Sequence, residues 1–208
     1  MLYRGSLNIR LTFGYDGDMV IPREPLIRGH RRDYTQAPIQ ISKAYLLGAL
    51  HDGTERRLTF RICQKSEDYI DLLARGIRSL GGNAWIYKEG KTRRLYVVEF
   101  SKSFLAKFSL KTEIDKIDYI RGYFDAEGGI ARTSKVRYYL YFAQKNLFDL
   151  LQVRNYLMEQ SIVCGIIHNP SKKVDPNYWR FYVNAKSYKD FAKKIGSWHP
   201  EKSLYLRG

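Results

Sequence analysis

The chain has 208 residues, 44% of them hydrophobic, so it can bury a core and suits one domain or two fused halves. Its 36 Lys and Arg against 21 Asp and Glu give a net charge of +15, which favours a polyanionic partner, chiefly nucleic acid. A basic solvated surface or a ribosome-associated protein is the plain alternative. It shows no signal peptide and no apolar run of about 18 residues, so we expect a cytoplasmic protein with no membrane partner.

Neither metal-site spacing nor a disulfide framework is visible in the cysteines. Cys63 and Cys164 lie far apart, each within an apolar run, and the four histidines are scattered. We therefore expect both cysteines to be core or strand residues in a reducing compartment.

Residues 1–40 are expected to form an N-terminal extension. Residues 6–13 alternate between apolar and polar side chains, as a strand would, and residues 23–32 are basic and contain two prolines. The basic stretch could lie along a phosphate backbone, or it could simply cover the core.

Residues 41–110 are expected to form a first half that begins with an apolar helix capped by Ser42. The elements predicted in order are that helix to His51, an alternating strand over 57–63, a helix over 66–80, strands over 85–88 and 95–101, and a short helix through Phe108.

Residues 111–208 are expected to form a second half with the same order of elements. The patterns predict a helix over 112–127 capped by Thr112, a strand region over 130–144, a helix over 146–160, strands near 163–168 and 178–183, and a helix over 187–195.

Two stretches repeat each other within this order. An apolar helix with an internal glycine ends at Asp52-Gly53, and a second ends at Glu127-Gly128. After each acid come an alternating strand, a Gln-Lys pair, a capping residue and a long helix. This ordered match indicates an internal duplication.

The repeated stretches resemble the LAGLIDADG motif of homing endonucleases, in the single-chain form that carries two motifs, and the resemblance covers Ile41 to about Lys202. It implies an α+β fold of two pseudo-symmetric αββαββα-like halves with antiparallel DNA-binding sheets, joined through two packed LAGLIDADG helices. It also implies a monomeric, intron-encoded endonuclease that hydrolyses both strands of a long near-palindromic or asymmetric DNA target.

The resemblance also suggests catalytic residues. Carried over by position, Asp52 and Glu127 would bind two or more divalent ions together with the backbone carbonyls of His51 and Ala126. Mg²⁺ is the expected ion, Mn²⁺ would substitute, and Ca²⁺ would bind without supporting cleavage; all of these favour oxygen ligands. Gln64 and Gln144 match the family's water-ordering glutamine, although a buried amide bonded to backbone is the alternative. The family also has a basic residue near its active site, and Lys111 and Lys202 are the candidates for it, with Lys107 as a substitute; a solvated lysine is the alternative for each.

Basic and aromatic residues on the strands and turns are the expected DNA-binding set. Major-groove reading is assigned to Arg57, Thr59, Arg61 and Lys65 in the first half and to Arg137, Tyr139, Tyr141 and Lys145 in the second. Phosphate contacts are assigned to Lys88, Lys91, Arg93, Arg94, Lys172 and Lys173. In this reading Arg61 could pair bidentately with guanine.

The first motif is irregular. Gly122 lies five residues before Glu127, but Gly48 lies only four before Asp52, and one helical residue is about 100° of rotation. We therefore expect the first helix to end a residue early, with His51 in a place where the family has a small residue. The alternative function is an intron maturase, or a DNA- or RNA-binding protein of the same fold that does not cut; intron RNA would then be a partner.

Overall fold

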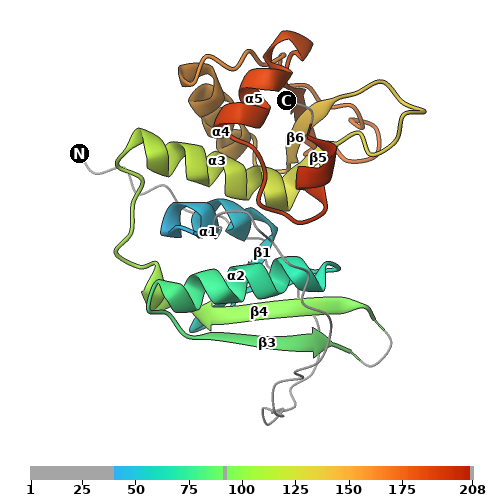
Figure 1. Cartoon of the computed structure of the whole chain (residues 1–208). Coiled ribbons are helices and arrows are strands. Elements are labelled where there is room, and N and C mark those ends of the chain that lie inside the picture. The colour runs from blue at the N-terminus through green and yellow to red at the C-terminus, as the bar shows by residue number, and fades with distance from the viewer. Residues whose placement is uncertain (1–39, 91–92, 207–208) are drawn as a thin grey trace.

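Two helices, α1 (Lys43–Ala49) and α3 (Glu113–Glu127), cross in the middle of the molecule and separate its two halves (Figure 1). The computed structural model describes residues 40–90 and 93–206, so the expected N-terminal extension falls outside the described residues except for Gln40. No helix in this described part of the chain is long and apolar enough to cross a membrane.

The expected helix caps are present. The Ser42 side chain accepts a hydrogen bond from the Tyr45 amide at 3.1 Å and starts α1. Thr112 and Asp115 form a reciprocal capping box that starts α3. The helices that follow the strands, α2 (Glu67–Ser79) and α4 (Leu147–Glu159), begin after the caps Ser66 and Asn146. These local hydrogen bonds explain why the sequence located all four helix starts.

Glycine permits the close crossing of α1 and α3. A Cβ atom on Gly48 would lie 2.0 Å from the Tyr119 carbonyl oxygen, and one on Gly122 would lie 2.0 Å from the Tyr45 carbonyl oxygen. Each glycine costs about 1 kcal/mol of helix propensity relative to alanine. In return the two helix backbones can approach closely, which no larger residue at these positions would permit.

The first half builds a four-stranded antiparallel sheet in the order β1-β2-β4-β3. Its strands are β1 (Gly53–Glu55), β2 (Thr59–Gln64), β3 (Ala84–Glu89) and β4 (Leu95–Ser101), and a 3₁₀ turn η2 (Lys102–Phe104) follows. Ile62, Val98 and Phe100 are buried in one core cluster with the apolar residues of α2. Arg61, Glu99 and Trp85 are register partners across β2, β4 and β3, so they share the opposite face.

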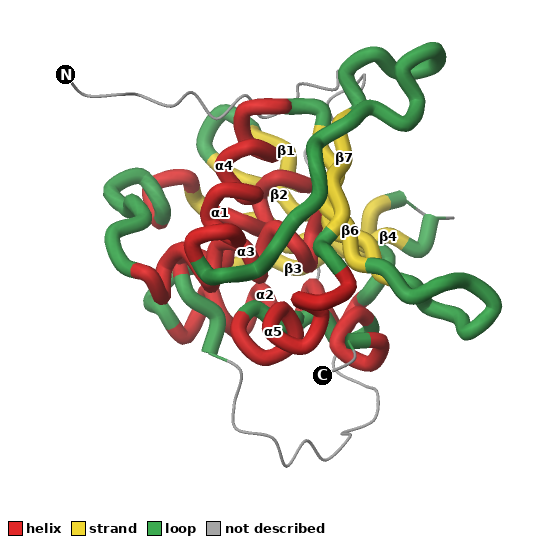
Figure 2. The backbone as a smooth tube through the Cα atoms, turned by 90° about the horizontal axis from the view of Figure 1, so that it is seen from above, coloured by secondary structure: helices red, strands yellow, loops and turns green. Residues whose placement is uncertain are grey.

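The second half builds a smaller antiparallel sheet in the order β5-β6-β7. Its elements are β5 (Gly128–Ile130), β6 (Leu140–Gln144), β7 (Trp179–Tyr182), the turn η3 (Ala185–Ser187), α5 (Tyr188–Lys194) and the turn η4 (Lys202–Tyr205). The strand expected at 163–168 is reduced to two isolated pairings, Cys164 with Val183 and His168 with Arg180. The segment that joins β5 to β6 projects from the body of the molecule (Figures 1 and 2).

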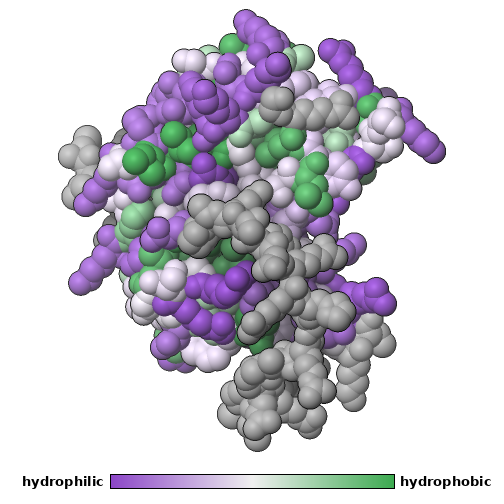
Figure 3. Space-filling model, viewed as in Figure 1, coloured by the Kyte–Doolittle hydropathy of each residue, from purple (hydrophilic) through white to green (hydrophobic). Residues whose placement is uncertain are grey.

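Each half has its own hydrophobic core. One core gathers buried residues between Ile41 and Leu105, the other between Tyr119 and Ile195, and Leu47 packs against both. Trp198 crosses back from the second half to the first, where it stacks on Tyr45 with ring centroids 4.9 Å apart. The C-terminal segment after α5 therefore closes over the boundary between the halves. In Figure 3 hydrophilic side chains dominate the upper part of the visible face, over the second half.

Candidate functional site

Two carboxylates meet where the crossing helices end. Asp52 is the last residue of the 3₁₀ turn η1 (Leu50–Asp52), which continues α1, and Glu127 is the last residue of α3. They are close enough for the charge of Glu127 to raise the pKa of Asp52. The fold thus brings together the two acids that the repeated motif singled out.

The shorter first motif reaches the same level as the second because its helix tightens. After Ala49 the chain switches to 3₁₀ geometry, as the sequence predicted when it required the helix to end early. A 3₁₀ residue advances about 2.0 Å and turns about 120°, against about 1.5 Å and 100° in an α-helix. From Gly48 to Asp52 the chain makes one α-helical and three 3₁₀ steps, which advance about 7.5 Å along the helix axis. The five α-helical steps from Gly122 to Glu127 advance the same distance. The difference in rotation about the axis between the two acids falls from about 100° to about 40°.

A glutamine at the end of a central strand contacts each acid. The Gln64 side-chain amide donates to the Asp52 carboxylate. The Gln144 amide lies 3.4 Å from Oε1 of Glu127 and 3.5 Å from the His51 carbonyl oxygen. Both glutamines therefore reach the carboxylate site. Gln144 also bonds to backbone, the partner that the buried-amide alternative supposed, because its Oε1 accepts from the Lys145 amide at 2.7 Å.

Lys202 brings a positive charge to the end of α3. Its Nζ donates to the carbonyl oxygens of Phe124, Asp125 and Gly128 at 2.7, 2.8 and 2.7 Å. These are helix-terminal carbonyls, where the helix dipole favours a cation. Lys202 is buried, and its charge reaches both acids of the site.

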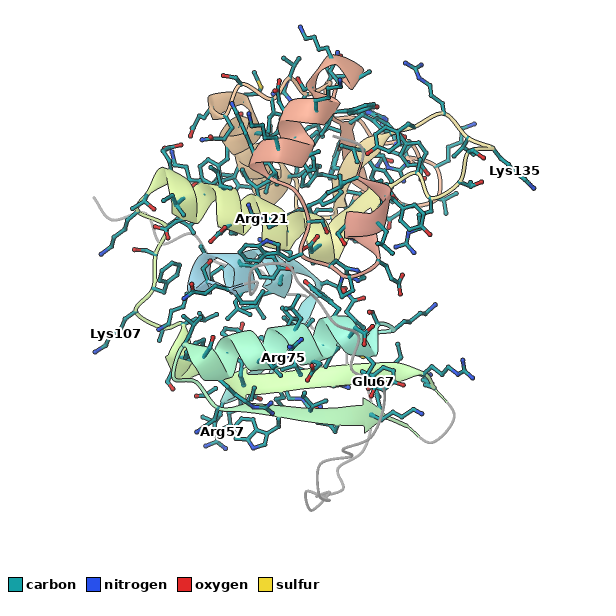
Figure 4. All side chains as sticks on the ribbon, in the orientation of Figure 1. Arg57, Glu67, Arg75, Lys107, Arg121 and Lys135 are labelled. Carbon is teal, nitrogen blue, oxygen red and sulfur yellow. The ribbon has the colours of Figure 1, made fainter. Side chains whose placement is uncertain are left out.

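The other lysine candidates lie elsewhere. Lys111 precedes the N-cap of α3, and its amide bonds to Asp115, at the opposite end of the helix from Glu127. Lys107 lies on the side of the molecule where α3 begins (Figure 4). Both expectations were wrong for the same reason: the end of the first half must lead into α3, so it cannot return to the site as the end of the second half does.

Asp125 anchors the segment that delivers Lys202. Its fully buried carboxylate accepts hydrogen bonds from the backbone amides of Trp198 and His199 at 2.9 and 3.1 Å, and from the Ser197 hydroxyl. It also accepts from the Tyr45 hydroxyl of α1 at 2.6 Å. Sequence reasoning missed this residue, although Asp125 stands inside the second motif, and its apolar neighbours would have been a signal of burial.

The electrostatics of the site are those of two acids and one cation. Burial among protein atoms, and then repulsion from Glu127, raise the pKa of Asp52 to about 7, while Lys202 opposes the shift. Water still reaches the Asp52 side chain and screens part of this effect. Burial lowers the pKa of Lys202 to about 8, although the nearby carboxylates favour its charged form. A divalent cation bound at the acids would remove their repulsion.

The donor set fits a hard cation. Asp52, Glu127 and the carbonyls of His51 and Ala126 offer oxygen atoms alone, the ligands that Mg²⁺, Mn²⁺ and Ca²⁺ prefer. Within residues 40–90 and 93–206 no cluster of three or more His, Cys, Asp or Glu side chains could hold a metal unaided. Mg²⁺ keeps several waters and is commonly bound by one or two carboxylates plus substrate phosphates, so two acids suffice.

A cavity of about 430 Å³ opens beside this site, between the two halves. Its lining includes Gln64 and Lys65 from the end of β2 and Arg132 and Lys202 from the second half. The lining also holds the acids Asp125 and Glu201, and Arg132 is ion-paired with Glu201 at 3.3 Å. Lys65 and Lys202 thus offer the positive charge that would suit an anionic group such as a phosphate.

The outer face of the first sheet is internally neutralised. Arg61 forms an ion pair with Glu89 at 2.6 Å, and Thr59 donates to Glu99 at 2.5 Å. Tyr87 also donates to Glu99, at 2.6 Å. Arg61 is therefore not free to pair with guanine, as we had expected, unless it exchanges partners. Sequence reasoning missed the acids of β3 and β4 because the register that brings them beside Arg61 is set by the pairing of the strands in the folded sheet.

Several other predicted contacts of the first half are displaced. Arg57 lies in the turn before β2, at the lower edge of the sheet (Figure 4), and not on the strand. Lys88 points to the face that α2 covers, because it pairs with Tyr96 rather than sharing the parity of Arg61. Lys65, Arg93 and Arg94 are exposed, and Lys91 lies outside the described residues.

The outer face of the second sheet carries an arginine among tyrosines. The Arg180 guanidinium lies 4.4 Å from the ring centroid of Tyr141 and donates to the hydroxyls of Tyr178 and Tyr182 at 2.6 and 3.2 Å. Tyr139 packs on Tyr141 with ring centroids 5.8 Å apart. Arg180 was missed by sequence reasoning, although its alternation with Trp179 and Phe181 was the available signal.

The remaining expected contacts of the second half lie at the edges of this face. Arg137 is exposed in the segment before β6, and Lys172 and Lys173 are exposed in the turn before β7. Lys145 is ion-paired with Asp175 at 2.6 Å. The two sheets thus present different surfaces: one with paired charges, the other aromatic with a central arginine.

Comparison with known proteins agrees with this architecture. Residues 116–196 match the family described as a LAGLIDADG-like domain. Structures of mesophilic variants of the homing endonuclease I-DmoI are similar over 74% of this chain and 94% of theirs, with 23% identity and a TM-score of 0.58. I-DmoI in complex with DNA and Ca is similar over 79% of this chain and 95% of its own, with 21% identity and a TM-score of 0.57.

The same fold occurs in a second setting. The N-terminal LAGLIDADG domain of DUF199/WhiA is similar over 74% of this chain and 80% of its own, with 19% identity and a TM-score of 0.58. No curated protein matches the sequence. At these identities the comparison of structures establishes a shared fold.

Proposed function

Because the chain has the LAGLIDADG fold and carries a LAGLIDADG-like domain over residues 116–196, we propose that it is a metal-dependent endonuclease that cuts double-stranded DNA at a specific site. The observation that carries the proposal is the meeting of Asp52 and Glu127 at the ends of the crossing helices, each contacted by a strand-end glutamine. Solved structures of the homing endonuclease I-DmoI include complexes with DNA and Mn and with DNA and Ca.

The divalent ions would be held by Asp52, Glu127 and the carbonyls of His51 and Ala126. Once bound they would supply charge neutralisation at the scissile phosphates and an acidified water as nucleophile. Asp52, with a pKa raised to about 7, is poised to lose its proton near neutral pH, which prepares the site for a cation. Gln64 and Gln144 donate to the acids and would help to order water beside them. Lys202 holds a positive charge beside the carboxylates and at the wall of the cavity.

The sheets would bind the duplex on their outer faces. Tyr139, Tyr141 and Arg180 offer stacking and a cation on the second sheet, and Lys172 and Lys173 stand at its edge to contact phosphates. The first sheet offers carboxylates as well as Arg61, so the two halves would read different half-sites. The duplex target would therefore be asymmetric, and the chain would act as a monomer.

The second candidate is a protein of this fold that binds DNA or intron RNA without cutting. Two observations favour it: the first motif is one residue shorter than the second, and the fold also occurs in DUF199/WhiA. Binding of a specific duplex without Mg²⁺-dependent cleavage would select this candidate.

The test is cleavage of a randomised DNA library in Mg²⁺, compared with Ca²⁺. The unmodified protein should cut one site in Mg²⁺ and only bind it in Ca²⁺. Asp52→Asn and Glu127→Gln should abolish cutting and keep binding. Asp71→Asn, which removes an exposed acid on α2, is the matched control and should cut normally. Cutting by both site variants would refute the assignment of the acids.

A further inference from the structure

The ends of the two motif helices are held by matching sets of three side chains. Superposing the crossing glycines, Gly48 on Gly122, places His51 opposite Asp125, and the residue missing from the first motif is then the counterpart of Ala126. His51 therefore does not replace a small residue, as sequence reasoning supposed. It occupies the place of a buried acid.

The set in the second motif centres on Asp125. Its carboxylate accepts from the Tyr45 hydroxyl of α1 at 2.6 Å, and that hydroxyl lies 3.1 Å from the hydroxyl of Tyr69 on α2. All three side chains are buried. The end of α3 is thereby tied to two helices of the opposite half.

The set in the first motif centres on His51. Its Nε2 lies 2.7 Å from the Tyr119 hydroxyl of α3, and its Nδ1 lies 3.6 Å from Oδ2 of Asp149 on α4. The imidazole also packs on Tyr123, with ring centroids 4.4 Å apart. The turn that ends in Asp52 is thereby tied to α3 and lies against Asp149 of α4.

The two sets occupy equivalent positions. Tyr45 and Tyr119 each stand three residues before the crossing glycine, and Tyr69 and Asp149 each stand three residues after the helix caps Ser66 and Asn146. The positions correspond, but the order of contacts differs: Tyr45 stands between Asp125 and Tyr69 in one set, and His51 stands between Tyr119 and Asp149 in the other. Two independent arrangements at related positions argue for a shared task.

One hydrogen bond and one ring contact orient His51. Nε2 and the Tyr119 hydroxyl share a hydrogen bond at 2.7 Å, while Nδ1 faces the Asp149 carboxylate at 3.6 Å, beyond hydrogen-bond distance. A ring that is bonded at Nε2 and packed on Tyr123 has one orientation, so it can set the position of the backbone that bears it.

We propose that His51 is a positioning residue: through its hydrogen bond to Tyr119 and its packing on Tyr123 across the interface, it holds the shortened 3₁₀ turn so that the His51 carbonyl and the Asp52 carboxylate stand where the second motif presents Ala126 and Glu127. The metal-binding part of this inference rests on the proposed nuclease function. The clamp itself is a property of the fold, and it can be measured without any cleavage.

Amide hydrogen exchange at the two helix ends tests the clamp. The Leu50 amide donates to carbonyls of α1, and the Gly53 amide donates to the Leu50 carbonyl, which closes the 3₁₀ turn. Tyr119→Phe removes one hydroxyl and should speed hydrogen exchange at these two amides by about five- to tenfold. The Gly128 amide at the end of α3 should stay within about twofold. Tyr45→Phe is the matched deletion of a hydroxyl from the same interface. It should leave the ratio of exchange at Leu50 to exchange in the rest of α1 as it is in the unmodified protein.

Two results would overturn the clamp. One is exchange of Leu50 and Gly53 at the unmodified rate in Tyr119→Phe. The other is equal acceleration at both helix ends, which would show general loosening of the interface. Both readings hold whether or not the chain cuts DNA, so failure of the proposed function leaves this test decisive.

Metal dependence tests the positioning role. His51→Ala should raise the Mg²⁺ concentration for half-maximal cleavage about tenfold or more, with Ca²⁺-supported DNA binding within about twofold of the unmodified protein. His51→Asn, which keeps an acceptor for the Tyr119 hydroxyl, should recover part of the loss. A lowered melting temperature with an unchanged Mg²⁺ midpoint would reduce His51 to a structural residue and refute its positioning role.

Discussion

Substituting Gly122 with alanine is the sharpest test of the helix crossing on which the site depends. The added methyl carbon would lie 2.0 Å from the Tyr45 carbonyl oxygen and 3.0 Å from the Ala49 amide nitrogen. Favourable contact needs about 3.5 Å. Both atoms belong to the backbone of α1, so no rotamer change can relieve the clash, and the two helices must move apart by about 1 Å or more.

The cost follows from that separation. Overpacking in a well-packed core costs about 1–3 kcal/mol, and a backbone clash belongs at the upper end, about 3 kcal/mol. Alanine returns about 1 kcal/mol through its higher helix propensity. We expect the free energy of unfolding to fall by about 2 kcal/mol, which lowers the melting temperature by about 4–8 °C in a chain of this size.

Thermal unfolding followed by circular dichroism measures the loss. Gly165→Ala is the matched control, because a Cβ atom there would meet its nearest neighbour, the Tyr182 carbonyl oxygen, at an ordinary 3.5 Å. The control should keep the melting temperature within about 2 °C of the unmodified protein. If Gly122→Ala is no less stable than Gly165→Ala, the helices do not cross as closely as described.

Three further outcomes are expected. Lys202→Met should leave three helix-end carbonyls without their donor and remove the positive charge that lowers the pKa of Asp52. Cleavage by this variant should therefore require a higher pH and more Mg²⁺, and an unchanged pH profile would contradict this. Burial lowers the pKa of His199 to about 3, whereas this histidine takes up a proton near pH 6.5 in the unfolded chain. The free energy of unfolding should therefore fall by up to about 1.4 kcal/mol for each pH unit below 6.5. Urea titrations of His199→Gln should show a shallower fall with pH, and equal slopes for the two proteins would show that this ring is not held neutral. Arg180→Gln should weaken specific DNA binding by about 1–3 kcal/mol. Lys172→Gln should mainly reduce the salt dependence of binding, by about one counterion. The reverse pattern in salt titrations would make Lys172 the residue for specific recognition and Arg180 the phosphate contact.

Local features of the fold were readable from the sequence. Ser42, Ser66, Thr112 and Asn146 start helices through hydrogen bonds to amides two or three residues away, so their effect is written within a few letters of the chain. The alternation that predicts a strand and the repeated acid-glycine ends are of the same kind. The LAGLIDADG fold and the two candidate metal-binding acids followed from these patterns.

The faces of the sheets were read less well. Alternation placed Arg61 on an outer face, but it could not show that Glu89, two strands away, is there to neutralise it. Nor could it show that Arg180 stands in the middle of a tyrosine cluster, because those tyrosines come from β6 and from both ends of β7. Strand register, which decides these neighbours, is set by the packing of the whole sheet.

The sequence by itself determined where helices begin, which strands alternate and that two acid-bearing ends repeat, because each of these is a matter of near neighbours. Only the tertiary structure decided that Lys202 and not Lys111 reaches the site, since one chain end returns across the interface and the other must enter α3. It also decided that His51 stands in for Asp125, a match visible only once the glycines of two helices are in contact. Contacts between residues far apart in the chain depend on how elements cross, and no local pattern records that angle.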